Sequence, residues 1–533
     1  MKNFLKTFSL LLLSSLLWSL AHPSAPPLIT KTSNYILDTG FQEVLAWFGL
    51  IPMLFALKGK SGKRLFFLAF LFSFFYFAIS QYWINIAVVM FGDISYVISF
   101  TIFIALMIEL ALQWALGIYI AYTVHQKYSY KLSTTLPITF TVTELFRNYF
   151  VFSGYPWSNI AYSQYYNLPI LQTASIWGVY GIVFMIVLCN VVLFEIYEYY
   201  KTENNFGFPK FASIFLILML TLSFSYGTYR LHANDVAEEN AKKLKAAMVQ
   251  GNIEQDLKNQ SFRHAYRIID VYKDLTKQIP DSVDLVIWPE AAFPFNIPRE
   301  TPHFKRTFTD LYDKLPWMFM TGVSTYTEDA ERNHKYYNSA FLFDKDTNVI
   351  AKSDKSHLVP FGEYVPMRDF LRLNQIVPGS GMFFPGVVGK GLSYDDIRFG
   401  VLICYEGIFP EISYEYAKSG VDFLVNITND AWYGVSSAAY QHMAFYSFRA
   451  VETRKALLRS ANTGFTSFID SSGRVYNSTK LFKRSVLIDN IPLLNERTIY
   501  SRIGDYPFRF LSIFWFYWFY LTFLKRKTIK KKA

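Results

Sequence analysis

The chain has 533 residues, of which 52% are hydrophobic, 19% aromatic and only 17% charged, and its mean hydropathy is +0.18. Soluble domains carry about 25% charged residues, so the composition argues against a purely soluble protein and indicates membrane spans joined to a polar part. The net charge of +11 comes without a nucleic-acid-binding motif. Two cysteines, Cys189 and Cys404, argue against a disulfide framework, and no Cys/His cluster has zinc spacing.

The first 230 or so residues are a succession of apolar runs close to the roughly 20 residues that cross a bilayer as a helix. We expect seven spans, near residues 5–20, 41–57, 65–84, 96–122, 133–152, 171–196 and 211–228. The first could instead be a cleaved signal peptide, with Lys2 and Lys6 before a leucine-rich core, although the many spans behind it favour retention. The fifth contains Glu144 and Arg147, which we expect to pair inside the bundle.

Basic residues gather in alternate loops of this region. They are Lys2 and Lys6, the KGKSGKR loop (58–64), His125 with Lys127 and Lys131, and Lys201 with Lys210. Positively charged loops face the cytoplasm, so seven spans would place the next segment outside it. An eighth apolar run, 508–524, then returns the chain to a basic cytoplasmic tail. The predicted parts are a transmembrane bundle (1–230), an extracytoplasmic domain (231–500) and a last span with its tail (501–533).

Within the extracytoplasmic part, residues 245–495 show strand-length apolar runs that alternate with turns. The expected buried strands are AAMVQGN (246–252), LVIWPE (285–290), WMFMTGV (317–323), FGVLICYE (399–406) and DFLVNIT (422–428). SAFLFD (339–344) alternates like a strand with one face in water. Segment 263–279 has helical apolar spacing and is expected to be an amphipathic helix. Strands that alternate with helices predict a layered α/β sandwich.

Cys404 ends one of these strand-like runs, 399–403. A thiol at the end of a buried strand is held rigidly, and its turn can offer backbone N–H groups to an oxyanion. A free thiol has a pKa of about 8.5 and needs a base or a cation beside it to be a good nucleophile. Without such partners, a small buried side chain is the commoner role of a free cysteine.

Two charged residues are candidate partners. Glu290 follows the run 285–288 among apolar neighbours, where poor solvation would raise its pKa and make it a usable base; the alternative is a surface glutamate at the end of a strand. Lys355, in KSDKSHLVPFGEYVP, could stabilise a thiolate and an oxyanion. It could equally be an ordinary solvated lysine, and Lys352 is a nearby competitor.

Three motifs in order, WPEAAFP (288–294), KSHLVPFGEYVP (355–366) and LICYEGIFPE (402–411), resemble the nitrilase-type hydrolase domain with its Glu–Lys–Cys triad. The fuller resemblance is to the bacterial apolipoprotein N-acyltransferase family, and it covers nearly the whole chain. Its further motifs are VQGNI (249–253), YYNSAF (336–341), TNDAWYG (428–434), segment 441–464, GDYP (504–507) and, in the membrane part, ELFRNYFVFSGYPW (144–157). One departure is visible: the family often carries a Trp shortly after QGNI, where this chain reads EQDLKNQSF with Asn259 near that place.

The resemblance implies an α-helical transmembrane bundle of about eight spans with a periplasmic nitrilase-like αββα sandwich. It implies that Glu290 is the general base, Lys355 the electrostatic stabiliser and Cys404 the acylated nucleophile. The supporting active-site positions are Glu363, which would orient the lysine, and Tyr405 and Glu406, which would lie beside the cysteine.

The activity implied is a ping-pong acyl transfer in the bacterial inner membrane, with the catalytic domain facing the periplasm. A fatty acyl chain would move from a phospholipid, at sn-1 of phosphatidylethanolamine, through a Cys404 thioester to the N-terminal amine of a diacylglyceryl-cysteine apolipoprotein. A thioester suits this transfer because an amine can open it. The resemblance implies no metal or cofactor, and the partners it implies are these two lipids and the bilayer. No nucleic-acid partner is expected because the chain has no nucleic-acid motif, and nothing in the sequence demands more than a monomer.

Two other functions fit parts of the sequence. A membrane-tethered nitrilase-type amidase would use the same triad with water in place of the amine, but the motifs in the membrane part favour the acyltransferase. A transporter or binding protein with an outer domain would leave Glu290, Lys355 and Cys404 without a reason to occur in family order.

Several polar residues outside the triad are assigned structural roles. Arg449, Glu452 and Arg459 are expected to form a network on one helix face beneath the site. His442 is expected to be a packed or hydrogen-bonded histidine rather than a base. Trp157, in the GYPW motif, is expected to anchor the chain at a membrane interface.

Overall fold

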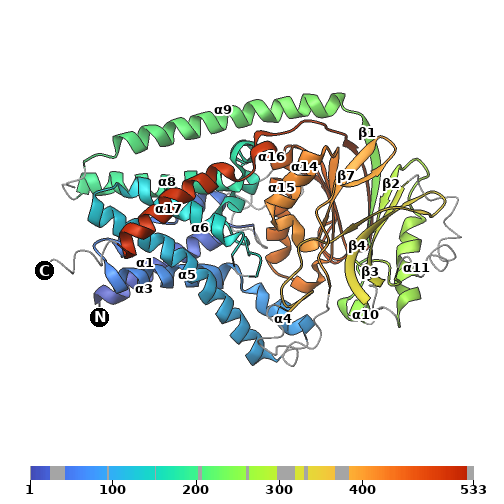
Figure 1. Cartoon of the computed structure of the whole chain (residues 1–533), viewed down its shortest axis with the longest axis horizontal. Coiled ribbons are helices and arrows are strands. Elements are labelled where there is room, and N and C mark those ends of the chain that lie inside the picture. Colours follow the sequence, from blue (N-terminus) through green and yellow to red (C-terminus); the bar gives the residue numbers. More distant parts are fainter. Residues whose placement is uncertain are drawn as a thin grey trace.

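The computed structural model describes residues 2–23, 42–92, 95–150, 152–201, 207–259, 263–296, 318–328, 334–365 and 383–524. A helical bundle occupies one end of the molecule and an α/β domain the other (Figure 1). The basic tail expected at 525–533 lies outside the described residues.

The bundle is built from the N-terminal half of the chain. Its helices are α1 (Lys2–Leu20), α2 (Ile51–Leu57), α3 (Gly62–Ser80), α4 (Trp83–Gly92), α5 (Tyr96–Tyr128), α6 (Leu132–Arg147), α7 (Leu168–Leu171), α8 (Ala174–Lys201) and α9 (Lys210–Asn240), with 3-10 turns η1 (Gln42–Trp47) and η2 (Ile160–Tyr166). Among the described residues, the five helices long and apolar enough to cross a membrane are α1, α3, α5, α8 and α9. The other three segments predicted as spans form the shorter pieces η1–α2 and α6 and the helix α17 (Tyr506–Phe523). The expected pair Glu144–Arg147 is confirmed as a buried ion pair of 2.7 Å within α6.

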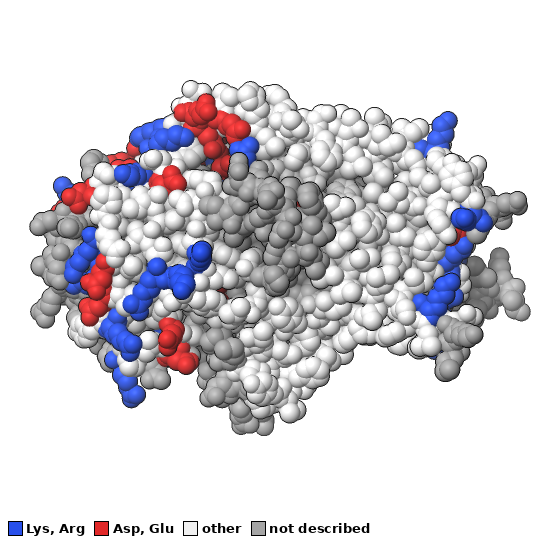
Figure 2. All heavy atoms as spheres, turned by 180° about the vertical axis from the view of Figure 1, so that it is seen from behind, with Lys and Arg blue, Asp and Glu red and all other residues white. Residues whose placement is uncertain are grey.

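The distribution of charge on the surface separates the two ends of the molecule. Seen from behind, Lys, Arg, Asp and Glu are scattered over the α/β domain, a broad band over the bundle carries none, and Lys and Arg reappear at the far end (Figure 2). The basic loops contact one another there, because Gln126 donates to the carbonyl of Lys60 and Lys131 to that of Phe208. The loops that the charge pattern assigns to one side therefore do lie together.

The α/β domain contains two six-stranded sheets. The first has the order β12 (Ser485–Pro492), β1 (Lys243–Gln250), β2 (Leu285–Ile287), β3 (Met318–Glu328), β4 (His334–Asp344), β5 (Val349–Asp354). The second has the order β11 (Val475–Ser478), β10 (Ser467–Ile469), β9 (Leu457–Ala461), β8 (Phe423–Thr428), β7 (Ile397–Ile403), β6 (Leu392–Tyr394). The strands β1–β2–β3 and β7–β8–β9 pair in parallel, and the outer strands pair antiparallel.

The sheets pack face to face over an apolar core, with Met248, Ile287 and Met320 from one and Val401 and Val425 from the other. Helix α11 (Ala265–Thr276) covers the outer face of the first sheet, and α14 (Pro410–Ser419) and α15 (Ala438–Thr453) cover that of the second. The predicted αββα sandwich is therefore confirmed. The expected strands and the amphipathic helix are all present within a few residues of their predicted limits.

The expectation of a wet face for SAFLFD is wrong. Residues 338–343 of β4 are all buried. Phe341 and Phe343 pack with the cluster beneath α11, while Ala340 and Leu342 point into the core between the sheets. Both faces of this strand are apolar-packed because the sheet lies between a helix layer and a second sheet.

The bundle and the α/β domain share one hydrophobic cluster, in which Trp157 and Tyr162 of the bundle pack with Phe445 of α15. Trp157 is 1% exposed, so its predicted role as an interfacial anchor is wrong: it fills the junction between the two parts. The chain crosses this junction through the long helix α9 and returns through α16 (Ile499–Ile503) and α17 (Tyr506–Phe523), which lies along the bundle (Figure 1). Helix α8 breaks at Gly178, where a Cβ would lie 2.5 Å from the ring of Tyr500.

Candidate active site

The three residues of the predicted triad follow the ends of three strands. Glu290 follows β2, Lys355 follows β5, and Cys404 follows β7 and begins the short 3-10 helix η5 (Cys404–Ile408). Their side chains are nearly buried, with exposed fractions of 7%, 1% and 9%. All three interact electrostatically with one another, so the fold brings together three residues from different stretches of the sequence.

An asparagine links the predicted base to the partner of the lysine. Asn338 on β4 donates through Nδ2 to Glu290 Oε1 at 2.8 Å and to Glu363 Oε1 at 2.9 Å. Glu363 in turn holds Lys355, whose Nζ lies 2.8 Å from Oε2, and it accepts the backbone N–H of Val359 at 2.8 Å. The two carboxylates and the ammonium therefore form one hydrogen-bonded chain, and Glu363 makes the contact with Lys355 that the motif suggested.

Lys352, the alternative candidate to Lys355, has a different environment. Lys352 lies on β5, is partly exposed and pairs with Asp354 at 3.0 Å. Burial alone would lower the pKa of Lys355, but the carboxylate of Glu363 and the nearby Cys404 and Glu290 raise it, so its ammonium stays protonated. A buried lysine that stays charged is suited to holding an anion rather than to moving a proton.

The Cys404 thiol is protonated at rest. Burial and the Glu290 carboxylate raise its pKa to about 12, against the opposing effects of Lys355 and of a hydrogen bond to Thr428. The backbone of Cys404 has a φ of +54°, a left-handed conformation that non-glycine residues seldom adopt and that is typical of a strained nucleophile turn. The thiol therefore needs a base to become a nucleophile, and Glu290 is the carboxylate beside it.

Glu406 holds the turn of the cysteine against the loop of the lysine. Its Oε1 accepts the backbone N–H and the hydroxyl of Ser356, both at 2.6 Å, and its Oε2 accepts the N–H of Ile403 at 2.7 Å. Tyr405 is buried, with its ring 5.2 Å from that of Phe409. Both residues follow Cys404 in η5, and Glu406 acts through the backbone of its neighbours.

Two site residues escaped the sequence analysis. Asn338 lies in the YYNSAF motif (336–341), and that motif is the signal that could have pointed to it. Lys258, in helix α10 (Gln255–Asn259), donates to the backbone carbonyl of Glu290 at 2.9 Å. Burial lowers the pKa of Lys258 to about 8, while Glu290 and Cys404 oppose this. Asn259 lies near the place where the family often carries a Trp, and its side chain lies outside the described residues.

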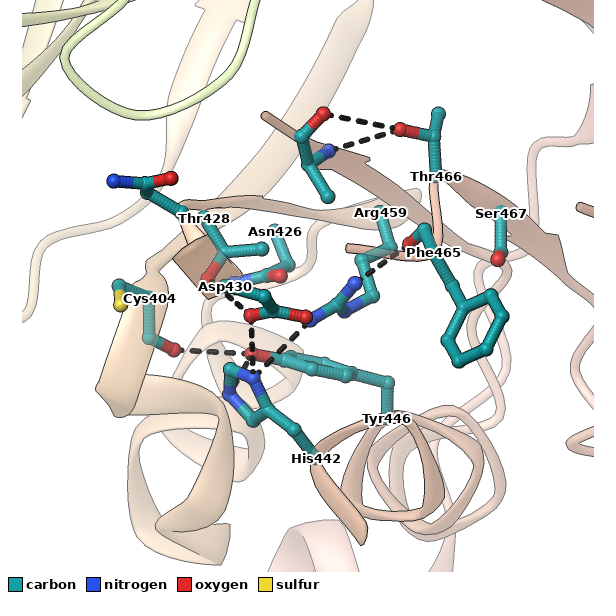
Figure 3. A network of polar contacts seen from close by, with 12 residues as sticks. Cys404, Asn426, Thr428, Asp430, His442, Tyr446, Arg459, Phe465, Thr466 and Ser467 are labelled. Carbon is teal, nitrogen blue, oxygen red and sulfur yellow. Dashed lines mark hydrogen bonds and ion pairs between the residues drawn. The ribbon is translucent and has the colours of Figure 1, made fainter. Parts of the chain in front are cut away.

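A second polar network lies beneath the turn of the cysteine (Figure 3). Arg459 donates to Asp430 at 2.7 Å, and His442 Nδ1 lies 3.0 Å from the same carboxylate, so the hydrogen-bonded role predicted for His442 is confirmed. Arg459 lies on β9, and only Arg449 and Glu452 pair along α15, at 2.6 Å. The predicted single helix face is therefore wrong for Arg459, because the chain turns into a strand after Thr453.

No group of three or more His, Cys, Asp and Glu side chains in the described part of the chain is arranged to hold a metal ion. The site itself offers a thiol, a carboxylate and a lysine, a combination suited to acyl transfer through a covalent intermediate.

Two family models match the chain. Residues 33–192 match the apolipoprotein N-acyltransferase N-terminal domain and residues 245–499 match carbon-nitrogen hydrolase. A solved carbon-nitrogen hydrolase from Helicobacter pylori G27 is 14% identical, with a TM-score of 0.36 over 51% of this chain and 94% of that one.

Curated relatives match both parts of the chain together. The apolipoprotein N-acyltransferase of Geobacter metallireducens is 38% identical over 86% of this chain and 87% of its own length. The apolipoprotein N-acyltransferase of Haemophilus influenzae is 30% identical over 91% of each. With a membrane-type helical half, an enzyme-type α/β half and relatives that span both, the chain belongs to the apolipoprotein N-acyltransferase family.

Proposed function

We propose that this protein moves a fatty acyl chain from a phospholipid to the N-terminal amine of a diacylglyceryl-cysteine apolipoprotein, through a thioester on Cys404. The observation that carries the proposal is the buried cluster of Glu290, Lys355 and Cys404 at the strand ends of a domain that is joined to apolar helices. Phosphatidylethanolamine, cleaved at sn-1, is the proposed donor.

In the first half-reaction Glu290 takes the thiol proton as Cys404 Sγ attacks the ester carbonyl of the donor. The oxyanion that forms is held by Lys355 and by backbone N–H groups at the turn of the cysteine. The C–O bond to glycerol then breaks, Glu290 returns its proton to the leaving oxygen, and a lysophospholipid departs. The raised pKa of the thiol supports this order, because the thiolate forms only as the base acts.

In the second half-reaction the neutral amine of the acceptor attacks the thioester carbonyl. Glu290 removes the proton from the attacking nitrogen, the same donors hold the oxyanion, and the C–S bond breaks. The products are an amide on the lipoprotein and a Cys404 thiol that has regained its proton from Glu290. The same buried base thus serves both half-reactions of the ping-pong mechanism.

We propose that the protein is a multi-pass protein of the bacterial inner membrane whose α/β domain faces the periplasm. The charge-free band over the bundle and the cluster of basic loops at its far end support this orientation (Figure 2). The proposed parts are the bundle (1–230), the catalytic domain (231–500) and a last span with its tail (501–533), and the proposed working unit is a monomer.

The competing function is an amidase in which water opens the acyl-enzyme. Membership of an acyltransferase family along both halves of the chain argues against it. The products separate the two, because an amidase releases ammonia from a small amide whereas the transferase releases lysophospholipid.

The proposal is tested by incubating the detergent-solubilised protein with phosphatidylethanolamine and no acceptor, and by measuring the mass of the intact protein and of its peptides. We expect a fatty-acyl mass on Cys404, labile to hydroxylamine and matched by lysophospholipid, and none on Cys404→Ser. A well-folded protein that forms no adduct with any phospholipid would refute the transferase.

A further inference from the structure

A tyrosine beneath the nucleophile turn holds the carbonyl of Cys404. Tyr446, on α15, is fully buried and donates through its hydroxyl to the backbone oxygen of Cys404 at 3.0 Å (Figure 3). Its ring lies against Gly407, where any Cβ would come within 2.1 Å of a ring carbon. The CYEG sequence therefore keeps a glycine where the tyrosine needs room to reach the cysteine.

The hydroxyl of Tyr446 is itself held from behind. His442 Nε2 lies 2.9 Å from it, one helical turn earlier on α15. The other ring nitrogen faces the Asp430 carboxylate at 3.0 Å and Arg459 Nη2 at 3.1 Å. A carbonyl oxygen only accepts hydrogen bonds, so the tyrosine hydroxyl donates to Cys404. The tyrosine oxygen then accepts from His442 in the tautomer that carries its proton on Nε2, and Nδ1 of that tautomer accepts from Arg459.

The bundle closes this network from the other side. The indole of Trp157 stacks on the His442 ring, with centroids 5.5 Å apart, and donates to Gln441 of α15 at 2.8 Å. His442 and Arg459 are fully buried, so water does not compete for these hydrogen bonds. A contact from the membrane part thus fixes the ring that orients Tyr446.

The hydrogen bond from Tyr446 to the Cys404 carbonyl also affects the N–H of the same peptide group. A peptide group is planar, and in its trans form the N–H points opposite to the C=O. Holding the oxygen of Cys404 therefore sets the direction of the Tyr405 N–H. That N–H, on the residue after the nucleophile, is the backbone donor best placed for an oxyanion on the acyl carbon.

We propose that Tyr446 is a positioning residue for acyl transfer: its hydroxyl, oriented by His442, fixes the peptide plane after the nucleophile and thereby aims the Tyr405 N–H at the oxyanion. The inference rests on the proposed function, because it takes Cys404 as the acylated residue. It assigns to the His442–Asp430–Arg459 network a role in catalysis that acts through backbone geometry.

The kinetic test compares Tyr446→Phe with Tyr440→Phe, the same change on the same helix at a residue that packs against Phe465. Losing one buried hydrogen bond should lower kcat for Cys404 acylation about tenfold in Tyr446→Phe. The KM for phospholipid should stay unchanged, because the fully buried Tyr446 side chain offers no surface to a bound lipid. Equal kcat in the two variants would overturn the inference while wild-type acylation left the proposed function standing.

A second measurement does not depend on turnover. The chain has two cysteines and only Cys404 precedes a tyrosine, so labelling with carbonyl-13C cysteine and 15N tyrosine gives a single Cys404–Tyr405 peptide signal. Tyr446→Phe should move the Cys404 carbonyl resonance upfield and shift the Tyr405 N–H, and Tyr440→Phe should leave both in place. A signal unchanged in Tyr446→Phe would overturn the positioning role whether or not the wild type forms an acyl-enzyme.

Discussion

Glu406 accepts the backbone N–H of Ser356 at 2.6 Å and so joins the turn after the nucleophile to the loop after Lys355. The same carboxylate accepts the N–H of Ile403 from the strand that carries Cys404. Two segments from different sheets are thereby held at one buried group, and the relative position of thiol and lysine depends on it.

Replacing Glu406 with Gln should therefore weaken both folding and catalysis. An amide offers an N–H where Glu406 accepts one, which leaves a buried donor facing a donor and costs about 1–3 kcal/mol of folding free energy. We expect a lower Tm and at least a tenfold slower acylation of Cys404. Glu415→Gln is the control, since Glu415 lies on the surface of α14 and pairs with Lys418. Two variants of equal stability and rate would contradict the role of Glu406.

Glu290→Gln should have opposite effects on thiol reactivity and on acyl transfer. The Glu290 carboxylate helps to raise the pKa of Cys404 to about 12, so its removal stabilises the thiolate and lowers that pKa. Alkylation of Cys404 by iodoacetamide at pH 9 should then speed up, while acylation by phospholipid falls about 10²–10⁴-fold for want of a base. The rates are measured against pH in a Cys189→Ala background, which leaves a single thiol. Slower alkylation in Glu290→Gln would show that the carboxylate is not near the thiol.

The strands and two members of the candidate triad, Glu290 and Cys404, could be predicted from the sequence because both depend on local patterns, whereas Lys355 was set apart from Lys352 only by the resemblance to the family. The expected strand 422–428 corresponds to β8, Phe423–Thr428, since a buried strand between two layers is a continuous apolar run. The candidates Glu290 and Cys404 each directly follow such a run, and strand ends are positions where a side chain is rigid yet reachable. Local pattern and proposed function coincide at these residues.

The other contacts of the site join residues that are far apart in the sequence, so no local sequence pattern predicts them. Asn338 meets Glu290 only because β4 lies beside β3 in the first sheet, and Tyr446 meets Cys404 only because α15 packs against η5. The assignment of Arg459 to a helix face failed for a related reason, since the apolar period of 441–453 continues into β9 and masks the change of element. The wet face expected on β4 failed because the sequence does not show that a second sheet covers it.

Asn338→Ala should slow acylation without unfolding the protein. One amide donates to both Glu290 and Glu363, so its loss removes two hydrogen bonds to charged groups and lets two carboxylates face each other without a donor. We expect acylation about 10- to 100-fold slower in a single-turnover assay with phosphatidylethanolamine. Asn477→Ala, which loses a hydrogen bond to Asp489 on outer strands, should retain the wild-type rate. A normal rate in Asn338→Ala would remove Asn338 from the site.

Deprotonation of Lys258 should lower the rate of Cys404 acylation at alkaline pH. Its ammonium holds the carbonyl of Glu290 and interacts with Cys404, and burial lowers its pKa to about 8. Above that pH the charge is lost and the developing anions at the site lose a cation, so the acylation rate should fall from about pH 8 upward. Lys258→Arg keeps the charge and should move this limit to higher pH, whereas Lys258→Met should be slow at every pH and lack the limb. Lys352→Met should leave the profile unchanged, because Lys352 pairs with Asp354 on β5; an alkaline limb that persists in Lys258→Met would assign it to another group.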